Sequence, residues 1–169
     1  MAILKGIRVL DNAIMKIMRT IGSVGVFVMT ISIILQILSR LVGQSFPWTE
    51  ELARYIMIWL CFLATAFLFN DPSYGGHIRV DVLVSLFPKY ISGPIEFLMN
   101  VCVSIFALIG SMWGFQLAMS SMDHFSTALH LPIGVVYLSF PVSMALIVFF
   151  SIRKVLEWAF KSKSVSEEK

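Results

Sequence analysis

The chain has 169 residues, of which 58 % are hydrophobic and 14 % are charged, and its mean hydropathy is +0.86. Because soluble globular domains carry about 25 % charged residues, this composition excludes an ordinary soluble domain and predicts an all-α integral membrane protein, with one membrane domain over residues 1–169. The net charge of +3 comes from basic residues that flank apolar stretches, so it gives no indication of nucleic-acid binding.

The chain opens with a basic amphipathic segment over residues 3–19. Its apolar residues recur at alternating steps of four and three, and Lys5, Arg8 and Lys16 lie on another helical face. This pattern is typical of a helix that lies in the interface between the bilayer and the cytoplasm. Two roles remain open for it: a simple membrane anchor, or a brace against a neighbouring subunit.

Four apolar stretches are long enough to cross a hydrocarbon core about 30 Å thick, which needs about 20 residues of helix. The predicted spans are residues 20–39, 48–70, 95–122 and 131–152. Every Lys and Arg except Arg40 and Arg54 lies before the first span, between the second and third, or after the fourth. The positive-inside rule therefore predicts that both termini are cytoplasmic, with residues 153–169 as a cytoplasmic tail.

Three charged residues stand at the start of the second span, just after Trp48. Glu50 and Glu51 are four and three residues before Arg54, so both acids can reach the arginine on one helical face. Charges at this depth cost a few kcal/mol each unless they are paired or face protein or water. The pattern predicts an ion-pair cluster that fixes this span to its neighbours. The alternative is helix capping plus an exposed salt bridge, worth at most about 1 kcal/mol.

The cytoplasmic loop between the second and third spans contains a Gly75-Gly76 pair, and an apolar pattern over residues 80–87 predicts a short interfacial helix. His77, Arg79 and Asp81 lie between these two features. They lack the spacing of a phosphate cradle or a metal site, and a turn with local stabilising contacts is the favoured interpretation.

The third span carries a stripe of small residues. Because there is no hydrophobic force between helices in lipid, close backbone approach is what holds them together, and small residues permit it. The stripe predicts a helix–helix packing face made of Ser104, Ala107, Gly110, Ser111 and Gly114.

Enzymatic and cofactor chemistry have no support in the sequence. No ionisable residue stands near the middle of a span, and the three histidines fall outside the spans. No nucleophile triad, zinc motif or phosphate-binding loop is present, so neither an enzyme, a metal site nor a cofactor is predicted. Two other classes remain open: a small self-assembling four-helix exporter, and a haem-bearing membrane anchor of an oxidoreductase.

Two motifs resemble the small membrane subunit of tripartite ATP-independent periplasmic (TRAP) transporters. They are Trp48-Thr49-Glu50-Glu51-Leu52-Ala53-Arg54-Tyr55, followed by Trp59, and Gly76-His77-Ile78-Arg79-Val80-Asp81. The length, the four spans and the cytoplasmic termini are similar to that family across nearly the whole chain. The resemblance implies that the residues of these motifs act at a subunit interface or in the structure: Trp48, Glu50, Glu51, Arg54, Trp59, His77, Arg79 and Asp81.

The resemblance also implies a location and partners. The chain would lie in the bacterial inner membrane with a large multi-span subunit and a soluble periplasmic substrate-binding protein. The large subunit would carry the substrate and the coupling Na⁺, and the small subunit would hold the scaffold. Family substrates are organic acids, including C4-dicarboxylates and sialic acids. Asp123 and His124, in an outer loop, are candidate docking points for the binding protein.

Overall fold

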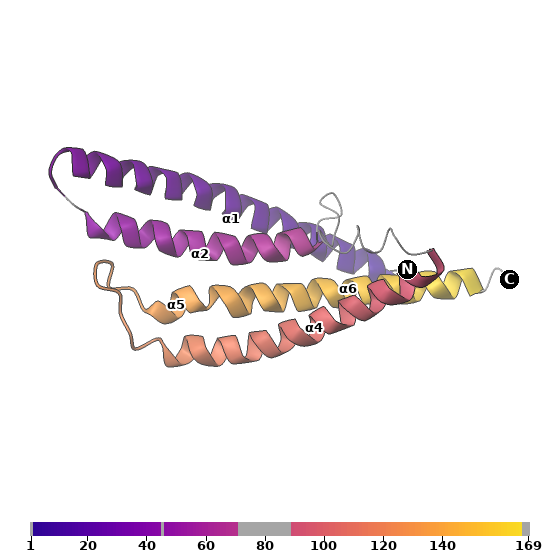
Figure 1. Ribbon diagram of the computed structural model, residues 1–169. Coiled ribbons are helices and arrows are strands. Elements are labelled where there is room, and N and C mark those ends of the chain that lie inside the picture. Colours follow the sequence, from indigo (N-terminus) through magenta and orange to yellow (C-terminus); the bar gives the residue numbers. More distant parts are fainter. Residues whose placement is uncertain (1, 45, 71–88, 167–169) are drawn as a thin grey trace.

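The computed structural model describes residues 2–44, 46–70 and 89–166, and these are almost entirely helical. The helices, shown in Figure 1, are α1 (Ala2–Leu41), α2 (Pro47–Asn70), α4 (Lys89–Ser120), α5 (Ile133–Tyr137) and α6 (Ser139–Ser166). The interfacial helix predicted over residues 80–87 lies outside the described residues, as do His77, Arg79 and Asp81.

Four helical segments are long and apolar enough to cross a membrane, which confirms the predicted all-α architecture with four candidate spans. They are Val9–Leu41, Pro47–Asn70, Phe97–Ser120 and Ile133–Val155. The first residues of α1 and the last residues of α6 lie at the same end of the molecule, and the connection from α1 to α2 lies at the opposite end (Figure 1). These two ends are called the terminus end and the loop end below.

Helix α1 runs without a break through the two elements predicted over residues 3–19 and 20–39. No proline separates them, so nothing in the sequence stops the helix. The predicted apolar stripe faces away from the other helices only in part: Leu10 and Ile17 are more than half exposed, while Ile14 packs against the buried hydrophobic cluster. The side of α1 that packs against the protein contains Asp11 and Met18, both buried. The interfacial location of residues 3–19 stays a prediction.

The fourth predicted span is divided into α5 and α6 at Leu138. Hydrogen bonds from Leu138 N to Gly134 O (2.9 Å) and from Val142 N to Leu138 O (3.1 Å) continue the helical ladder on both sides. Pro141 has no N–H to give to the carbonyl of Tyr137, so the ladder loses a bond at this point. The break thus follows from a single proline near the start of α6.

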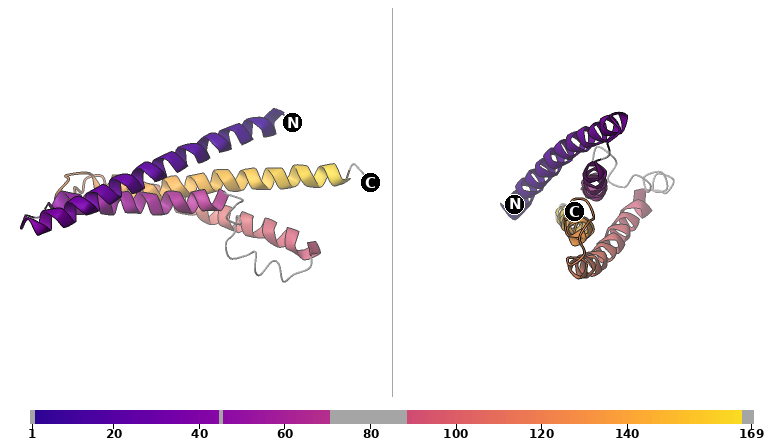
Figure 2. Two further views of the ribbon diagram at one scale, coloured as in Figure 1. Left: turned by 90° about the horizontal axis from the view of Figure 1, so that it is seen from above. Right: turned by 90° about the vertical axis from the view of Figure 1, so that its left-hand side faces the viewer.

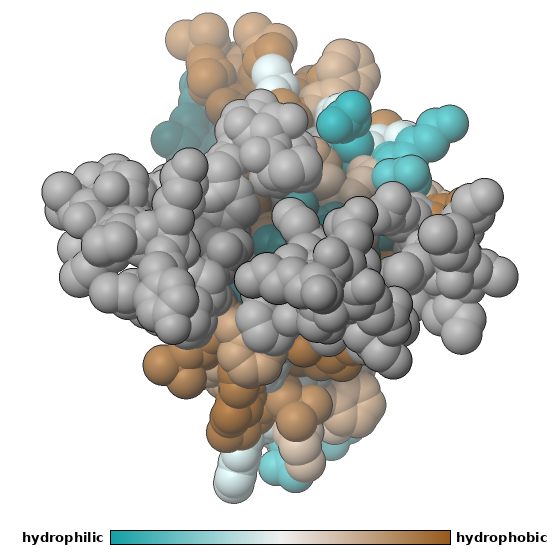
Figure 3. Space-filling model, turned by 90° about the vertical axis from the view of Figure 1, so that its right-hand side faces the viewer, coloured by the Kyte–Doolittle hydropathy of each residue, from teal (hydrophilic) through white to brown (hydrophobic). Residues whose placement is uncertain are grey.

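The four long helices form an open row in the order α1, α2, α6, α4 (Figure 2). Helix α1 packs on α2, α2 on α6, and α6 on α4, so α1 and α4 form the two edges of the row. The apolar surface is large on both edges, with Phe27 of α1 at 67 % and Trp113 of α4 at 70 % exposure. Seen from the terminus end, hydrophobic side chains project at both edges of the molecule (Figure 3).

Helix α6 lies between α2 and α4, and its span has the largest buried share of the four. Three of its serines, Ser139, Ser143 and Ser151, are completely buried. The Ser143 hydroxyl donates to Phe62 O of α2 at 2.5 Å, and the Ser151 hydroxyl donates to Asn100 O of α4 at 3.1 Å. Small hydroxyl side chains let helices approach closely and supply hydrogen bonds between them. These serines therefore hold α6 against both α2 and α4.

Candidate functional site

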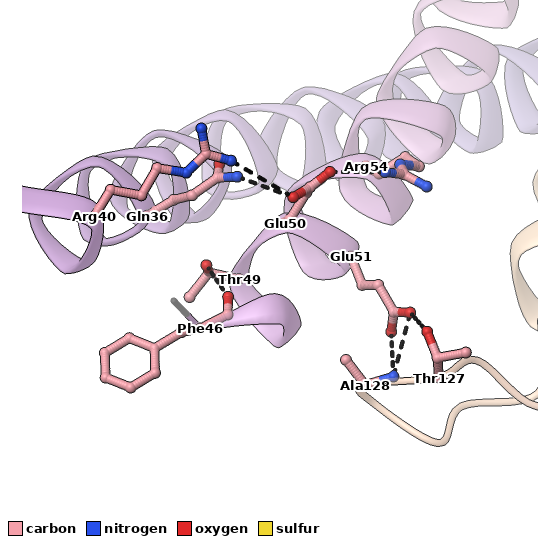
Figure 4. Close-up of polar contacts among 9 residues, drawn as sticks. All are labelled: Gln36, Arg40, Phe46, Thr49, Glu50, Glu51, Arg54, Thr127 and Ala128. Carbon is pink, nitrogen blue, oxygen red and sulfur yellow. Dashed lines mark hydrogen bonds and ion pairs between the residues drawn. The ribbon is translucent and has the colours of Figure 1, made fainter. Parts of the chain in front are cut away.

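The side chain of Glu50 connects α1 to α2 at the loop end. Its carboxylate accepts a hydrogen bond from Gln36 Nε2 of α1 at 3.3 Å and one from Arg54 NH2 at 3.0 Å (Figure 4). Arg40 of α1 lies 3.9 Å from the same carboxylate. These four residues are called the Glu50 cluster. Because Glu50 and Arg54 are both more than half exposed, the cluster is a surface feature, and screening limits its contribution to stability.

Helix α2 begins where it does because of Phe46, Pro47 and Thr49. Proline is favoured at the first helical position, where its fixed φ suits the helix and no N–H is needed. The carbonyl of Phe46 accepts both the backbone N–H of Thr49 at 3.1 Å and its hydroxyl at 2.7 Å. Thr49 is completely buried, so this turn is held firmly and places Glu50 and Glu51 on two different sides of the helix (Figure 4).

Glu51 binds the loop between α4 and α5. Its carboxylate accepts the hydroxyl of Thr127 at 2.8 Å, the backbone N–H of Leu129 at 2.9 Å and that of Ala128 at 3.2 Å. The sequence-based prediction joined both acids to Arg54. In the structure Glu50 pairs with Arg54, while the donors that Glu51 meets belong to the loop. The predicted cluster is therefore two separate contacts that serve two different neighbours of α2.

The loop from Ser121 to Pro132 has an ordered backbone. Ser126 N donates to Leu131 O at 2.9 Å and Ile133 N donates to His124 O at 2.7 Å, which closes the loop on itself. His130 has a φ of 50°, in the left-handed region. Asp123 and His124, the predicted docking residues, are exposed on this loop at the loop end of the row.

The two tryptophans of the α2 motif lie apart from these polar contacts. Trp48 is 41 % exposed and its ring centroid is 6.5 Å from that of Phe46. Trp59 is half-buried along α2.

The small-residue stripe of α4 faces α6. Ala107 is buried, and the Ser104 hydroxyl lies 2.5 Å from that of Ser151. The Ser111 hydroxyl donates to Pro141 O at 3.3 Å. Gly110 and Gly114 both lie against the ring of Phe140, where a Cβ on Gly114 would come within 2.7 Å of that ring. All five predicted packing residues thus lie on the α4–α6 contact.

A second polar cluster, at the terminus end, was missed by the sequence reasoning. It comprises Asp11 of α1, Asn70 of α2 and Arg153 of α6, and is called the Asp11 cluster below. Asn70 Nδ2 donates to Asp11 Oδ1 at 2.7 Å, and Arg153 donates to Asn70 Oδ1 at 2.8 Å and to Asp11 Oδ2. Asp11 and Asn70 are buried, at 6 % and 4 % exposure. The available signal was Asp11 itself, the only acid before Glu50 and one placed within a basic segment.

Cationic contacts with aromatic rings surround the Asp11 cluster. Lys154 of α6 donates to Phe69 O at 2.6 Å, and its Nζ lies 4.3 Å from the centroid of the Phe69 ring. Arg19 of α1 lies over the ring of Phe67 at 5.8 Å. Both contacts reach α2 from a neighbouring helix, so they support the same helix junction.

The chemistry of these clusters is that of helix attachment. In the part of the chain that the structure describes, no group of three or more His, Cys, Asp or Glu side chains could hold a metal ion. The charged side chains pair with groups on adjacent helices or loops, at the two ends of the long helices. The fold and the site together define a class: a multi-span helical membrane protein whose polar side chains hold its helices in a row.

Comparison with known proteins identifies the family within this class. Residues 29–161 match the family described as the DctQ component of tripartite ATP-independent periplasmic transporters, and the chain belongs to that family. It is therefore a component of a transporter and not an enzyme, which excludes the haem-bearing anchor of an oxidoreductase.

Two similar proteins carry names that refer to TRAP transporters. A protein of Haemophilus influenzae named as a TRAP transporter small permease protein is 29 % identical over 115 residues, which are 66 % of this chain and 68 % of that protein. The isethionate TRAP transporter permease protein DctMQ of Oleidesulfovibrio alaskensis is 32 % identical over 101 residues, which are 59 % of this chain but 15 % of that protein. The matched segment is thus a small part of a much longer permease.

Proposed function

We propose that this TRAP transporter small permease subunit is a static scaffold, which holds a large membrane subunit in position while that subunit transports organic acids. The observation that carries the proposal is the open row of helices with polar attachments at both ends. In an open row, both edge helices present apolar surface that lipid or another membrane protein can cover. A fixed row of this kind is suited to bracing a moving partner.

A large membrane partner is supported by the second relative, in which the matched segment is 15 % of a long permease protein. The proposed partner is a large subunit of the kind that makes up the rest of such a permease. Coupling to Na⁺ and substrate translocation belong to that partner in this proposal, because no Asp, Glu, His, Lys or Arg lies near the middle of a described span. The proposed substrates are organic acids of the C4-dicarboxylate or sialic acid class.

The proposed location is the bacterial inner membrane with both termini in the cytoplasm. The distribution of Lys and Arg supports this orientation. The start of α1 and the end of α6 lie at one end of the molecule, which supports placing both termini on the same side of the membrane. The loop end then faces the periplasm. Asp123 and His124 are exposed there, on a loop that Glu51 attaches to α2, and we propose them as docking points for a periplasmic substrate-binding protein.

The proposal is tested by uptake into proteoliposomes that contain the large subunit, with the purified binding protein and a labelled organic acid outside. We expect uptake when the small subunit is present, and little or none when it is omitted. Equal uptake without the small subunit would contradict the scaffold role. Uptake or efflux by the small subunit alone would instead support the self-assembling exporter.

A further inference from the structure

Two polar contacts join α1 to α2, and they are spaced differently on the two helices. Gln36 bonds to Glu50 at the loop end, and Asp11 bonds to Asn70 at the terminus end. On α2 the two contacts are 20 residues apart, or about 30 Å of helix, which is the thickness of a bilayer hydrocarbon core. On α1 they are 25 residues apart, or about 38 Å.

The longer path on α1 accompanies an inclination of this helix relative to α2. An inclined helix covers a longer path between the same two levels, and the long side chains of Gln36 and Glu50 can take up part of the difference. The structure has this crossing, and the inclination of α1 across the row is visible in Figure 2. The two contacts are thus made by α1 in this inclined position.

The Asp11 cluster, at the terminus end, favours one register of α1 against α2 and α6. Both carboxylate oxygens of Asp11 are engaged, one by Asn70 and the other by Arg153. Arg153 also binds Asn70, so the three side chains form a closed ring. The side chains of Asp11 and Arg153 are only 9 % and 14 % exposed. Breaking a buried ion pair leaves an uncompensated charge, which is strongly unfavourable.

We propose that Asp11, Asn70 and Arg153 are positioning residues that fix the register and tilt of α1 on α2 and α6. Moving α1 by one helical turn in one direction would put Ile14 or Met15 where Asp11 now lies, and in the other direction it would put Ile7 there, or Arg8 as a second cation beside Arg153. An apolar side chain there satisfies neither the guanidinium nor the amide. Buried ionic groups are best attested as devices that specify register, and this cluster has the composition and burial for that use.

The functional consequence rests on the proposed scaffold function. Helix α1 is one edge of the row, so its tilt sets the outline that this edge presents to a membrane partner. The structural part of the inference concerns the small subunit alone, and it is therefore testable without any partner.

Distances between spin labels, measured by pulsed electron resonance on the full chain in lipid nanodiscs, provide the test. With Cys61 and Cys102 replaced by serine, labels at Val9 of α1 and Ile152 of α6 report on the terminus end; both positions are more than half exposed. A second pair, at Val42 and Met57, reports on the loop end. Asp11→Asn keeps the shape of the side chain and removes its charge.

We expect Asp11→Asn to broaden the Val9–Ile152 distribution and shift it by up to about one helical turn, ~5 Å. A slip of α1 along its axis shifts the Val42–Met57 distribution as well, whereas a change of tilt about the Gln36–Glu50 contact leaves that distribution near the parent. The matched control is Asn12→Ala, which changes the neighbouring, exposed polar residue and should leave both distributions as in the parent. A parent-like Val9–Ile152 distribution in Asp11→Asn would overturn the inference.

The double variant Asp11→Arg with Arg153→Asp tests the positioning of α1 if the single variant does not fold. The Asn70 amide both donates and accepts, so it can serve the reversed pair as it serves the natural one. We expect the double variant to restore the parent distribution. Failure to restore it in a folded protein would overturn the inference. The two proposals can fail separately. If the label distances confirm that the Asp11 cluster positions α1, but uptake is normal without the small subunit, the positioning role is retained and the scaffold function is rejected.

Discussion

Glu51 of α2 accepts the backbone N–H of Leu129 at 2.9 Å and so attaches α2 to a loop 78 residues further along the chain. Glu50, the preceding residue, binds Gln36 of α1 on another side of the same helix. Two adjacent acids thus attach α2 to two different neighbours. At the loop end, α2 is therefore held to α1 on one side and to the loop between α4 and α5 on the other.

Replacing Glu51 should loosen the loop without disturbing the junction of α1 and α2. In Glu51→Ala, the N–H groups of Ala128 and Leu129 lose their acceptor, and we expect both amides to exchange hydrogen several-fold faster. Hydrogen exchange with mass spectrometry measures this. Glu50→Ala removes the same charge one residue away and serves as control, and unchanged exchange in Glu51→Ala would show that the loop is held by other contacts.

Arg54→Ala tests whether the exposed ion pair with Glu50 has a role outside the isolated chain. Because both side chains are more than half exposed, and Glu50 keeps Gln36 and Arg40, we expect stability to fall by no more than about 1 kcal/mol. We also expect recovery of the complex with a large subunit to fall, since the guanidinium is available to a partner. Normal recovery and normal uptake would leave Arg54 as an ordinary surface residue.

A graded glycine series tests the α4–α6 contact. In Gly114→Ala the new Cβ would lie 2.7 Å from Phe140, and we expect a loss of about 1–3 kcal/mol from overpacking. Gly110→Ala, at 3.4 Å from the same ring, should cost less. Gly22→Ala in α1 meets nothing within 4 Å and should be neutral or slightly stabilising. Thermal unfolding of the purified protein ranks the three, and equal midpoints would contradict the described packing.

Ser143 tests how closely α6 approaches α2. Ser143→Ala removes one interhelical hydrogen bond to Phe62 O, and we expect a loss of about 0.6–1 kcal/mol, typical of such bonds in membranes. Ser143→Leu forces a large side chain into a completely buried position and should cost more, about 1–3 kcal/mol. If the leucine variant is as stable as the alanine variant, the two helices are not in close contact at this position.

The number of spans and the small-residue stripe could be predicted because each depends on a property of one segment. A run of apolar residues is long enough to cross a bilayer whatever its neighbours are, and α2 begins and ends within one residue of the predicted span. The stripe from Ser104 to Gly114 indicated a packing face for the same reason. Which helix it meets depends on the tertiary arrangement, and that was not predictable from the pattern.

The polar clusters could be predicted only in part because their members come from distant segments. Glu50 and Arg54 are four residues apart, and this local pair is present. Asp11 and Arg153 are separated by 142 residues, so no sequence spacing connects them. The sequence predicts that Glu51 pairs with Arg54, but donors in a loop 76 to 78 residues away bind Glu51 instead. Local spacing gives the contacts that are possible, and the fold selects among them.

The scaffold account is tested most directly by mass spectrometry of the proteins that co-purify with the tagged chain from its native membranes in mild detergent. The account predicts a large multi-span membrane protein in stoichiometric amount, with or without a periplasmic binding protein. Recovery of the chain alone, or as a homo-oligomer, would contradict it.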